Sequence, residues 1–123
     1  MLFISCAFLL IILSCDGVEY KEHIVGNYYI IKSEGQIDLS YKLEKGAYVG
    51  KVPSNIVEYG FNQKYIIAKT RNSNKSYSFF IIDRAKDFGS AIEENFRIGP
   101  ITEIQFEKNW REKLNIELHE VED

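Results

Sequence analysis

Hydrophobic and polar side chains alternate strictly between Gln36 and Leu43. The apolar positions of this stretch are Ile37, Leu39, Tyr41 and Leu43. Successive side chains of a strand point to opposite faces of a sheet, so the pattern predicts a strand with one buried and one solvated face. Less regular patterns predict further strands at residues 24–32, 47–52 and 57–61. Phe61 occupies an apolar position of the last of these, and we expect it to face the interior.

Two runs, Tyr65–Ala68 and Phe79–Ile82, are apolar at both odd and even positions. This pattern is typical of strands that are covered on both faces, so these two segments are the best candidates for the core. The segment between them, Arg71–Ser76, contains no apolar residue and predicts an exposed hairpin loop.

The pattern changes to a helical one near the C-terminus. Thr102 is a suitable N-cap, and Gln105 three positions later completes a capping box. The spacing of Phe106, Trp110 and Leu114 predicts a helix over Glu103–Leu114 that packs this stripe onto the sheet, with Ile104 joining from the flank. Residues 84–95 fit either a loop or one irregular helical turn. The predicted fold is therefore α+β, a mainly antiparallel sheet of about five to six strands with one C-terminal helix.

The first residues have the features of an export signal. Leu2–Leu13 is almost uninterrupted apolar sequence, long enough for a signal peptide and shorter than the roughly 18 residues of a membrane-spanning helix. Residues 12–15, Ile-Leu-Ser-Cys, resemble the bacterial lipobox, in which the cysteine becomes lipidated and N-terminal. We therefore expect a signal peptide at 1–14, lipidation of Cys15, a polar tether at 15–23, one β-rich domain at 24–116 and an acidic tail at 117–123. The alternative is an uncleaved anchor or a buried core helix.

Charge and cysteine content narrow the possible classes of protein. The chain has 15 basic and 18 acidic residues, a formal net charge of −3. This balance argues against a nucleic-acid-binding protein, which needs a basic face to neutralise phosphates. Cleavage before Cys15 removes Cys6, so the mature chain has no disulfide and no free thiol.

Several short motifs resemble those of a family of small bacterial lipoproteins classed as a domain of unknown function. The matching segments are Gly26-Asn27-Tyr28, Lys64–Lys69, Phe80–Asp83, and Gly99-Pro100 followed by Phe106. The resemblance implies a lipid-anchored β-rich domain. It implies no activity and assigns no residue a functional role.

No set of residues in the sequence predicts a catalytic or metal site. His23 and His119 have no metal-ligand spacing. Asp83 and Asp87 are carboxylates near a strand end, where acid–base chemistry is one interpretation and a turn or helix cap is the favoured one. We therefore predict no catalytic residue, no metal and no cofactor.

The remaining candidates are surface residues for recognition of a protein partner. Arg71 and Lys75 lie in the predicted hairpin loop, and Tyr41 and Tyr59 are expected to reach a surface. The predicted function is a lipid-anchored cell-envelope protein that acts as a non-enzymatic binding or interaction module. The alternative is a small inhibitor or immunity-type lipoprotein that blocks a secreted enzyme through the loop. The expected partners are the membrane, through the lipid on Cys15, and an unknown protein.

Overall fold

Two antiparallel sheets form most of the computed structural model, which describes residues 18–87 and 96–121. The first sheet consists, in spatial order, of β1 (Val18–Val25), β2 (Tyr28–Ser33), β3 (Gln36–Lys42) and β4 (Tyr48–Val52). The second consists, in spatial order, of β8 (Arg97–Thr102), β7 (Tyr77–Asp83), β6 (Tyr65–Arg71), β5 (Ile56–Phe61) and β9 (His119–Glu120). The helices are η1 (Arg84–Lys86, a 3₁₀ turn), α2 (Glu103–Asn109) and α3 (Arg111–Leu114).

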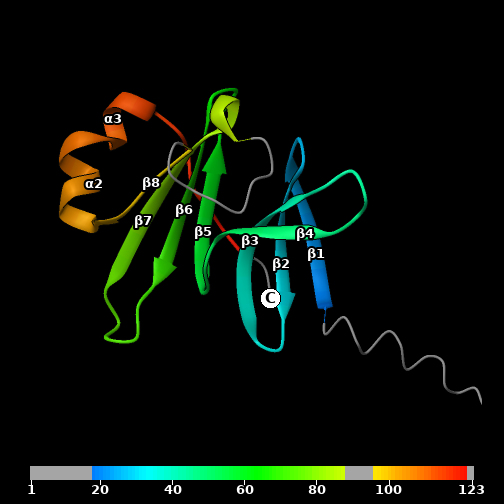
Figure 1. Ribbon diagram of the computed structural model, residues 1–123. Coiled ribbons are helices and arrows are strands. Elements are labelled where there is room, and N and C mark those ends of the chain that lie inside the picture. Colours follow the sequence, from blue (N-terminus) through cyan, green and yellow to red (C-terminus); the bar gives the residue numbers. More distant parts are fainter. Residues whose placement is uncertain (1–17, 88–95, 122–123) are drawn as a thin grey trace, which may run out of the picture.

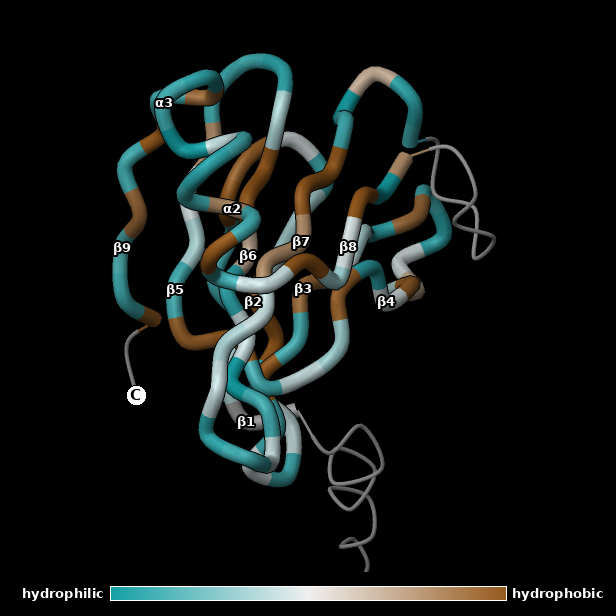
Figure 2. Tube along the Cα trace, turned by 90° about the vertical axis from the view of Figure 1, so that its left-hand side faces the viewer, coloured by the Kyte–Doolittle hydropathy of each residue, from teal (hydrophilic) through white to brown (hydrophobic). Residues whose placement is uncertain are grey.

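These elements stack in three layers, with α2 and α3 on the side of the second sheet that faces away from the first (Figure 1). One hydrophobic cluster joins the sheets and includes Ile30, Leu39, Ile66 and Ile82. A second cluster joins the second sheet to the helices and includes Ile67, Ile81, Phe79 and Phe106. β6 and β7 supply residues to both clusters, which confirms the prediction that they are covered on both faces. Figure 2 shows the hydrophobic segments of these strands and the mainly hydrophilic turns.

The C-terminal helix begins as predicted but is divided in two. The Thr102 side chain accepts a hydrogen bond from the Gln105 backbone, and the Gln105 side chain accepts one from the Thr102 backbone, so the capping box is confirmed. At Trp110 the backbone leaves helical geometry, with φ −127°, and separates α2 from α3. Phe106 stacks on Phe79 with ring centroids 4.1 Å apart. Ile104 is 79% exposed, so its predicted place in the core is wrong. Residues two positions apart in an α-helix point to nearly opposite faces, so Ile104 faces solvent when Phe106 faces the sheet.

The predicted tether and tail both take part in sheets. β1 includes residues 18–23 and pairs with β2 along its length. Its charged residues, including Lys21 and Glu22, are typical of an edge strand, and they also suit a polar tether. β9 lies within the predicted tail and pairs with β5, with Glu58 opposite Glu120. The described residues therefore form nine strands, more than the five to six expected.

Three smaller features of the fold concern turns and strand ends. Phe61 is the last residue of β5 and 42% exposed, so the prediction that it faces the interior is wrong. Gly99-Pro100 lies inside β8, beside an irregularity in its pairing with β7. Of the uncertain segment 84–95, residues 84–86 form the helical turn η1, and residues 88–95 lie outside the described residues.

No helix within 18–87 and 96–121 is long and apolar enough to cross a membrane.

Candidate functional site

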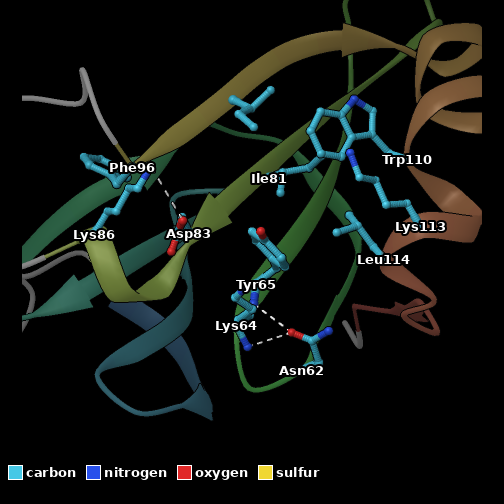
Figure 3. Close-up of a pocket in the computed structure, with 11 residues that line it drawn as sticks. Asn62, Lys64, Tyr65, Ile81, Asp83, Lys86, Phe96, Trp110, Lys113 and Leu114 are labelled. Carbon is cyan, nitrogen blue, oxygen red and sulfur yellow. Dashed lines mark hydrogen bonds and ion pairs between the residues drawn. The ribbon is translucent and has the colours of Figure 1, made fainter.

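A pocket of about 550 Å³ opens between the helices and the second sheet (Figure 3). β6, β7, β8 and α3 supply apolar lining, together with the junction between α2 and α3. The apolar lining residues are Tyr65, Ile81, Phe96, Ile98, Trp110 and Leu114. The pocket thus has the apolar surface that is typical of sites for small molecules.

Hydrogen bonds hold the polar side of the pocket in place. The side-chain oxygen of Asn62 accepts from the backbone amides of Lys64 and Tyr65, both at 2.8 Å, which fixes the turn between β5 and β6. Arg84 donates to the Asn62 carbonyl at 2.7 Å and ties this turn to η1. Asp83 caps η1 by accepting from the Ala85 amide at 3.1 Å, which confirms its interpretation as a helix cap. The turn and η1 are therefore fixed relative to each other.

The charged lining residues are three lysines and one aspartate. Lys86 Nζ lies 4.0 Å from Asp83 Oδ2. Lys113 Nζ lies 5.0 Å from the Trp110 ring centroid, and Lys64 Nζ lies 5.8 Å from that of Tyr65. The pocket therefore carries a local excess of positive charge on a chain whose net charge is −3.

A second polar site is sealed between the two sheets. Lys51, from β4, places Nζ 2.8 Å from Asp87 Oδ1, and both side chains are 0% exposed. Tyr28, from β2, donates its hydroxyl to the other oxygen, Asp87 Oδ2, at 2.8 Å. Lys51 Nζ also lies 4.3 Å from the Phe96 ring centroid. Burial and the bond to Asp87 raise the pKa of the Tyr28 hydroxyl well above its usual range, so Tyr28 remains a neutral donor.

The four predicted contact residues do not form one surface. Arg71 and Lys75 are exposed at the hairpin between β6 and β7, as expected. Tyr41 is half-buried in the first sheet, and its ring lies edge-on to Tyr28. Tyr59 is 9% exposed and donates its hydroxyl to Glu22 at 2.5 Å, so its predicted surface position is wrong.

The predicted lipidation site, Cys15, lies outside the described residues. Within residues 18–87 and 96–121, no group of three or more His, Cys, Asp or Glu side chains is arranged to hold a metal ion. His23 contacts the Gly26 carbonyl at 2.7 Å, and His119 lies against the Tyr59 ring. The two histidines are thus engaged in separate local contacts.

Comparison with protein families gives one result. The family described as "Protein of unknown function (DUF3997)" matches residues 25–122. The chain belongs to the DUF3997 family. The resemblance to a family of unknown function is thereby confirmed. Neither the curated proteins nor the solved structures contain a match to this chain.

The DUF3997 match contains both sites and begins after the lipobox-like residues. The motifs that carried the resemblance supply part of the pocket: Lys64 and Tyr65 come from one of them, and Ile81 and Asp83 from another. The sequence therefore contained a signal for the pocket, although each motif alone indicated only a strand. The buried site gave less of a signal: Tyr28 belongs to the Gly26-Asn27-Tyr28 motif, but Lys51 only follows a short apolar run and Asp87 only follows a turn.

Proposed function

We propose that this protein is a lipid-anchored, non-enzymatic binding module of the bacterial cell envelope, and that its pocket holds a ligand with an apolar body and an anionic group. The observation that carries the proposal is the combination of apolar lining with three lysines in one pocket. The apolar residues would cover the body of the ligand. The lysines would offer charge-assisted hydrogen bonds to its carboxylate or phosphate.

The position of the pocket is consistent with an anchor at Cys15. β1 begins at Val18, close to Cys15 in the sequence. Figures 1 and 2 both place the start of β1 at one end of the domain and α3 at the other. A lipid on Cys15 would therefore present the pocket away from the membrane.

Trp110 provides a direct test of ligand binding, because it lines the pocket and is the only tryptophan in the chain. We expect decanoate to change the emission of Trp110 saturably, and decanol, which has no charge, to bind at least about tenfold more weakly. Lys113→Gln should weaken decanoate and leave decanol unchanged. The matched control is Lys108→Gln, since Lys108 is an exposed lysine on α2 that does not line the pocket. Equal binding of decanoate by the Lys113 variant and the control would refute the anionic-ligand proposal.

The anchor is tested separately by Cys15→Ser in the full chain. We expect this variant to remain folded and to leave the membrane fraction, because without Cys15 the chain carries none of the acyl chains that stable anchoring requires. Recovery of the variant in the membrane fraction at the level of the unaltered chain would refute lipid anchoring and would leave the pocket proposal intact.

The hairpin between β6 and β7 supports a second candidate, an inhibitor or immunity-type lipoprotein. Its exposed tip is held by side-chain hydrogen bonds: Asn72 donates to Ser76 at 2.9 Å and to Ser78 at 3.0 Å, and Ser76 donates to Asn74 at 2.6 Å. An ordered loop loses little entropy on insertion into a cleft. If this is the function, deletion of residues 72–75 should abolish inhibition of a secreted enzyme and spare the fold.

A further inference from the structure

The buried site contains two groups that can combine chemically. The amine of Lys51 and the carboxyl group of Asp87 lie 2.8 Å apart, nitrogen to oxygen, in a place with no solvent exposure. Ionised groups lose several kcal/mol of hydration free energy when they are buried. A neutral amine and a neutral carboxylic acid avoid most of that cost, and transfer of one proton across the hydrogen bond produces them.

We propose that Lys51 and Asp87 join through an intramolecular isopeptide bond, formed in the folded chain by loss of one water molecule. The nitrogen is held beside an oxygen that is bonded to Cγ, the carbon it must attack. Near-attack geometries in catalysis have reacting atoms about 3–3.5 Å apart. Nζ already contacts Oδ1 at 2.8 Å, so only a small shift of the Lys51 side chain is needed to carry it from Oδ1 to the adjoining Cγ.

The reaction needs no oxidant, reductant or further reactant. A proton passes from Nζ to Oδ1, and the nitrogen lone pair then forms a bond to Cγ while the Cγ–Oδ2 double bond becomes a single bond. A second proton moves from Nζ to Oδ1, the Cγ–Oδ1 bond breaks, and Oδ1 departs as water. The double bond to Oδ2 re-forms, and the product is an amide between the two side chains.

Tyr28 is placed to assist this step. Its hydroxyl donates to Oδ2 at 2.8 Å, the atom on which negative charge develops when the nitrogen attacks. The hydroxyl is protonated at physiological pH, and burial together with the bond to Asp87 raises its pKa further above that range. The Phe96 ring beside Lys51 Nζ helps to exclude bulk water, which would otherwise favour the separated ions.

The bond would tie the two sheets together covalently. Lys51 is in β4 of the first sheet, and Asp87 follows β7 of the second through η1. Such a link restricts the unfolded chain in the way that a disulfide does, and it persists in reducing conditions. This inference is independent of the pocket and of its ligand.

Peptide mass spectrometry of the full chain, purified from the membrane fraction or the cytosol without denaturation, tests the proposal. Trypsin does not cleave after an acylated lysine, so the cross-linked chain gives a branched peptide in which residues 46–64 are joined to residues 87–97. Its mass is lower than the sum of the two linear peptides by one water molecule. Recovery of only the linear peptides 46–51, 52–64 and 87–97 would overturn the proposal and would leave Lys51 and Asp87 as an ion pair.

Three variants separate the chemistry from simple proximity. Lys51→Arg keeps the charge but should give no branched peptide. Asp87→Asn should give the same branched peptide as the unaltered chain, because ammonia then leaves in place of water. Tyr28→Phe should lower the branched fraction at a fixed time after synthesis at least about tenfold, since removal of one oxyanion donor costs a factor of about 10²–10³ in rate. An unchanged rate in Tyr28→Phe would remove Tyr28 from the mechanism.

Discussion

Asp83 and Asp87 cap the two ends of the same one-turn helix, η1, yet their lysine partners have very different surroundings. Asp87 meets Lys51 at 2.8 Å between the sheets, and neither side chain is exposed. Asp83 meets Lys86 at 4.0 Å beside the pocket, where the side chains are 26% and 62% exposed. One short helix thus holds one carboxylate in the protein interior and the other in contact with solvent.

The comparison shows that the environment of these ion pairs, rather than the residue types, determines their contribution. Water screens the outer pair, and exposed pairs of this kind contribute about 0–1 kcal/mol to stability. The inner pair is unscreened, so each charge depends on the other and on the Tyr28 hydroxyl. Structural roles are therefore expected at Asp87, and roles in ligand binding are expected near Asp83.

The largest predicted difference follows from removing the lysine of each pair. Lys51→Met leaves the Asp87 carboxylate buried without its cation and should lower the free energy of unfolding by about 3–5 kcal/mol. Loss of the proposed amide bond would act in the same direction. Lys86→Met, the matched control in the outer pair, should lower it by at most about 1 kcal/mol. Urea unfolding at neutral pH measures both values, and similar losses would mean that the two sites do not differ as described.

The Tyr28 hydroxyl allows a finer test of the inner site. Tyr28→Phe removes a hydrogen bond to a buried side-chain oxygen of Asp87 and should cost about 1–3 kcal/mol at neutral pH. Folding raises the pKa of this hydroxyl above its ordinary value of 10.0, so the folded state holds the proton more tightly than the unfolded state does. The stability that this raised pKa contributes is fully present below pH 10.0 and declines as the pH rises further.

The unaltered chain should therefore lose stability above pH 10.0 relative to its value at neutral pH, and Tyr28→Phe should lose less over the same range. Urea unfolding of both chains across this range measures the difference. Parallel curves for the two chains would show that Tyr28 is not held in its neutral form by the fold.

The elements of the fold that could be predicted from the sequence are those that local patterns determine. β6 and β7 were predicted correctly, because a short run that is apolar at both odd and even positions is typical of a strand covered on both faces. The capping box at Thr102 was predicted because its hydrogen bonds are local. β1 was missed because the charged residues of an edge strand resemble those of a linker.

The two sites depend on contacts between residues far apart in the chain, and single-sequence patterns do not encode these. Lys51 and Asp87 meet only when β4 and the end of η1 pack together. Tyr59 was expected to reach a surface, but Glu22 of the unpredicted β1 accepts its hydroxyl. The pocket likewise requires α3 to lie over the second sheet, although four of its residues belong to recognisable motifs.

The smallest predicted effect concerns Asp38, a partly buried acid in β3. It borders a groove of about 380 Å³ that Lys51 and Arg97 also line. Partial burial raises the pKa of the Asp38 carboxyl above its ordinary value of 3.8, so the folded state binds this proton more tightly than the unfolded state does. The stability of the protein then falls as the pH rises from the pKa of Asp38 in the unfolded chain to its pKa in the folded chain. Above the folded-state pKa the loss is complete.

Replacing Asp38 with asparagine should therefore stabilise the protein at neutral pH and leave its stability unchanged below pH 3.8. The side chain is still partly solvated, so we expect a gain of only about 0.2–0.5 kcal/mol. Paired urea unfolding curves at the two pH values measure it. A loss of stability at neutral pH would show that the Asp38 carboxylate is favourably paired in the folded chain, as the Asp87 carboxylate is.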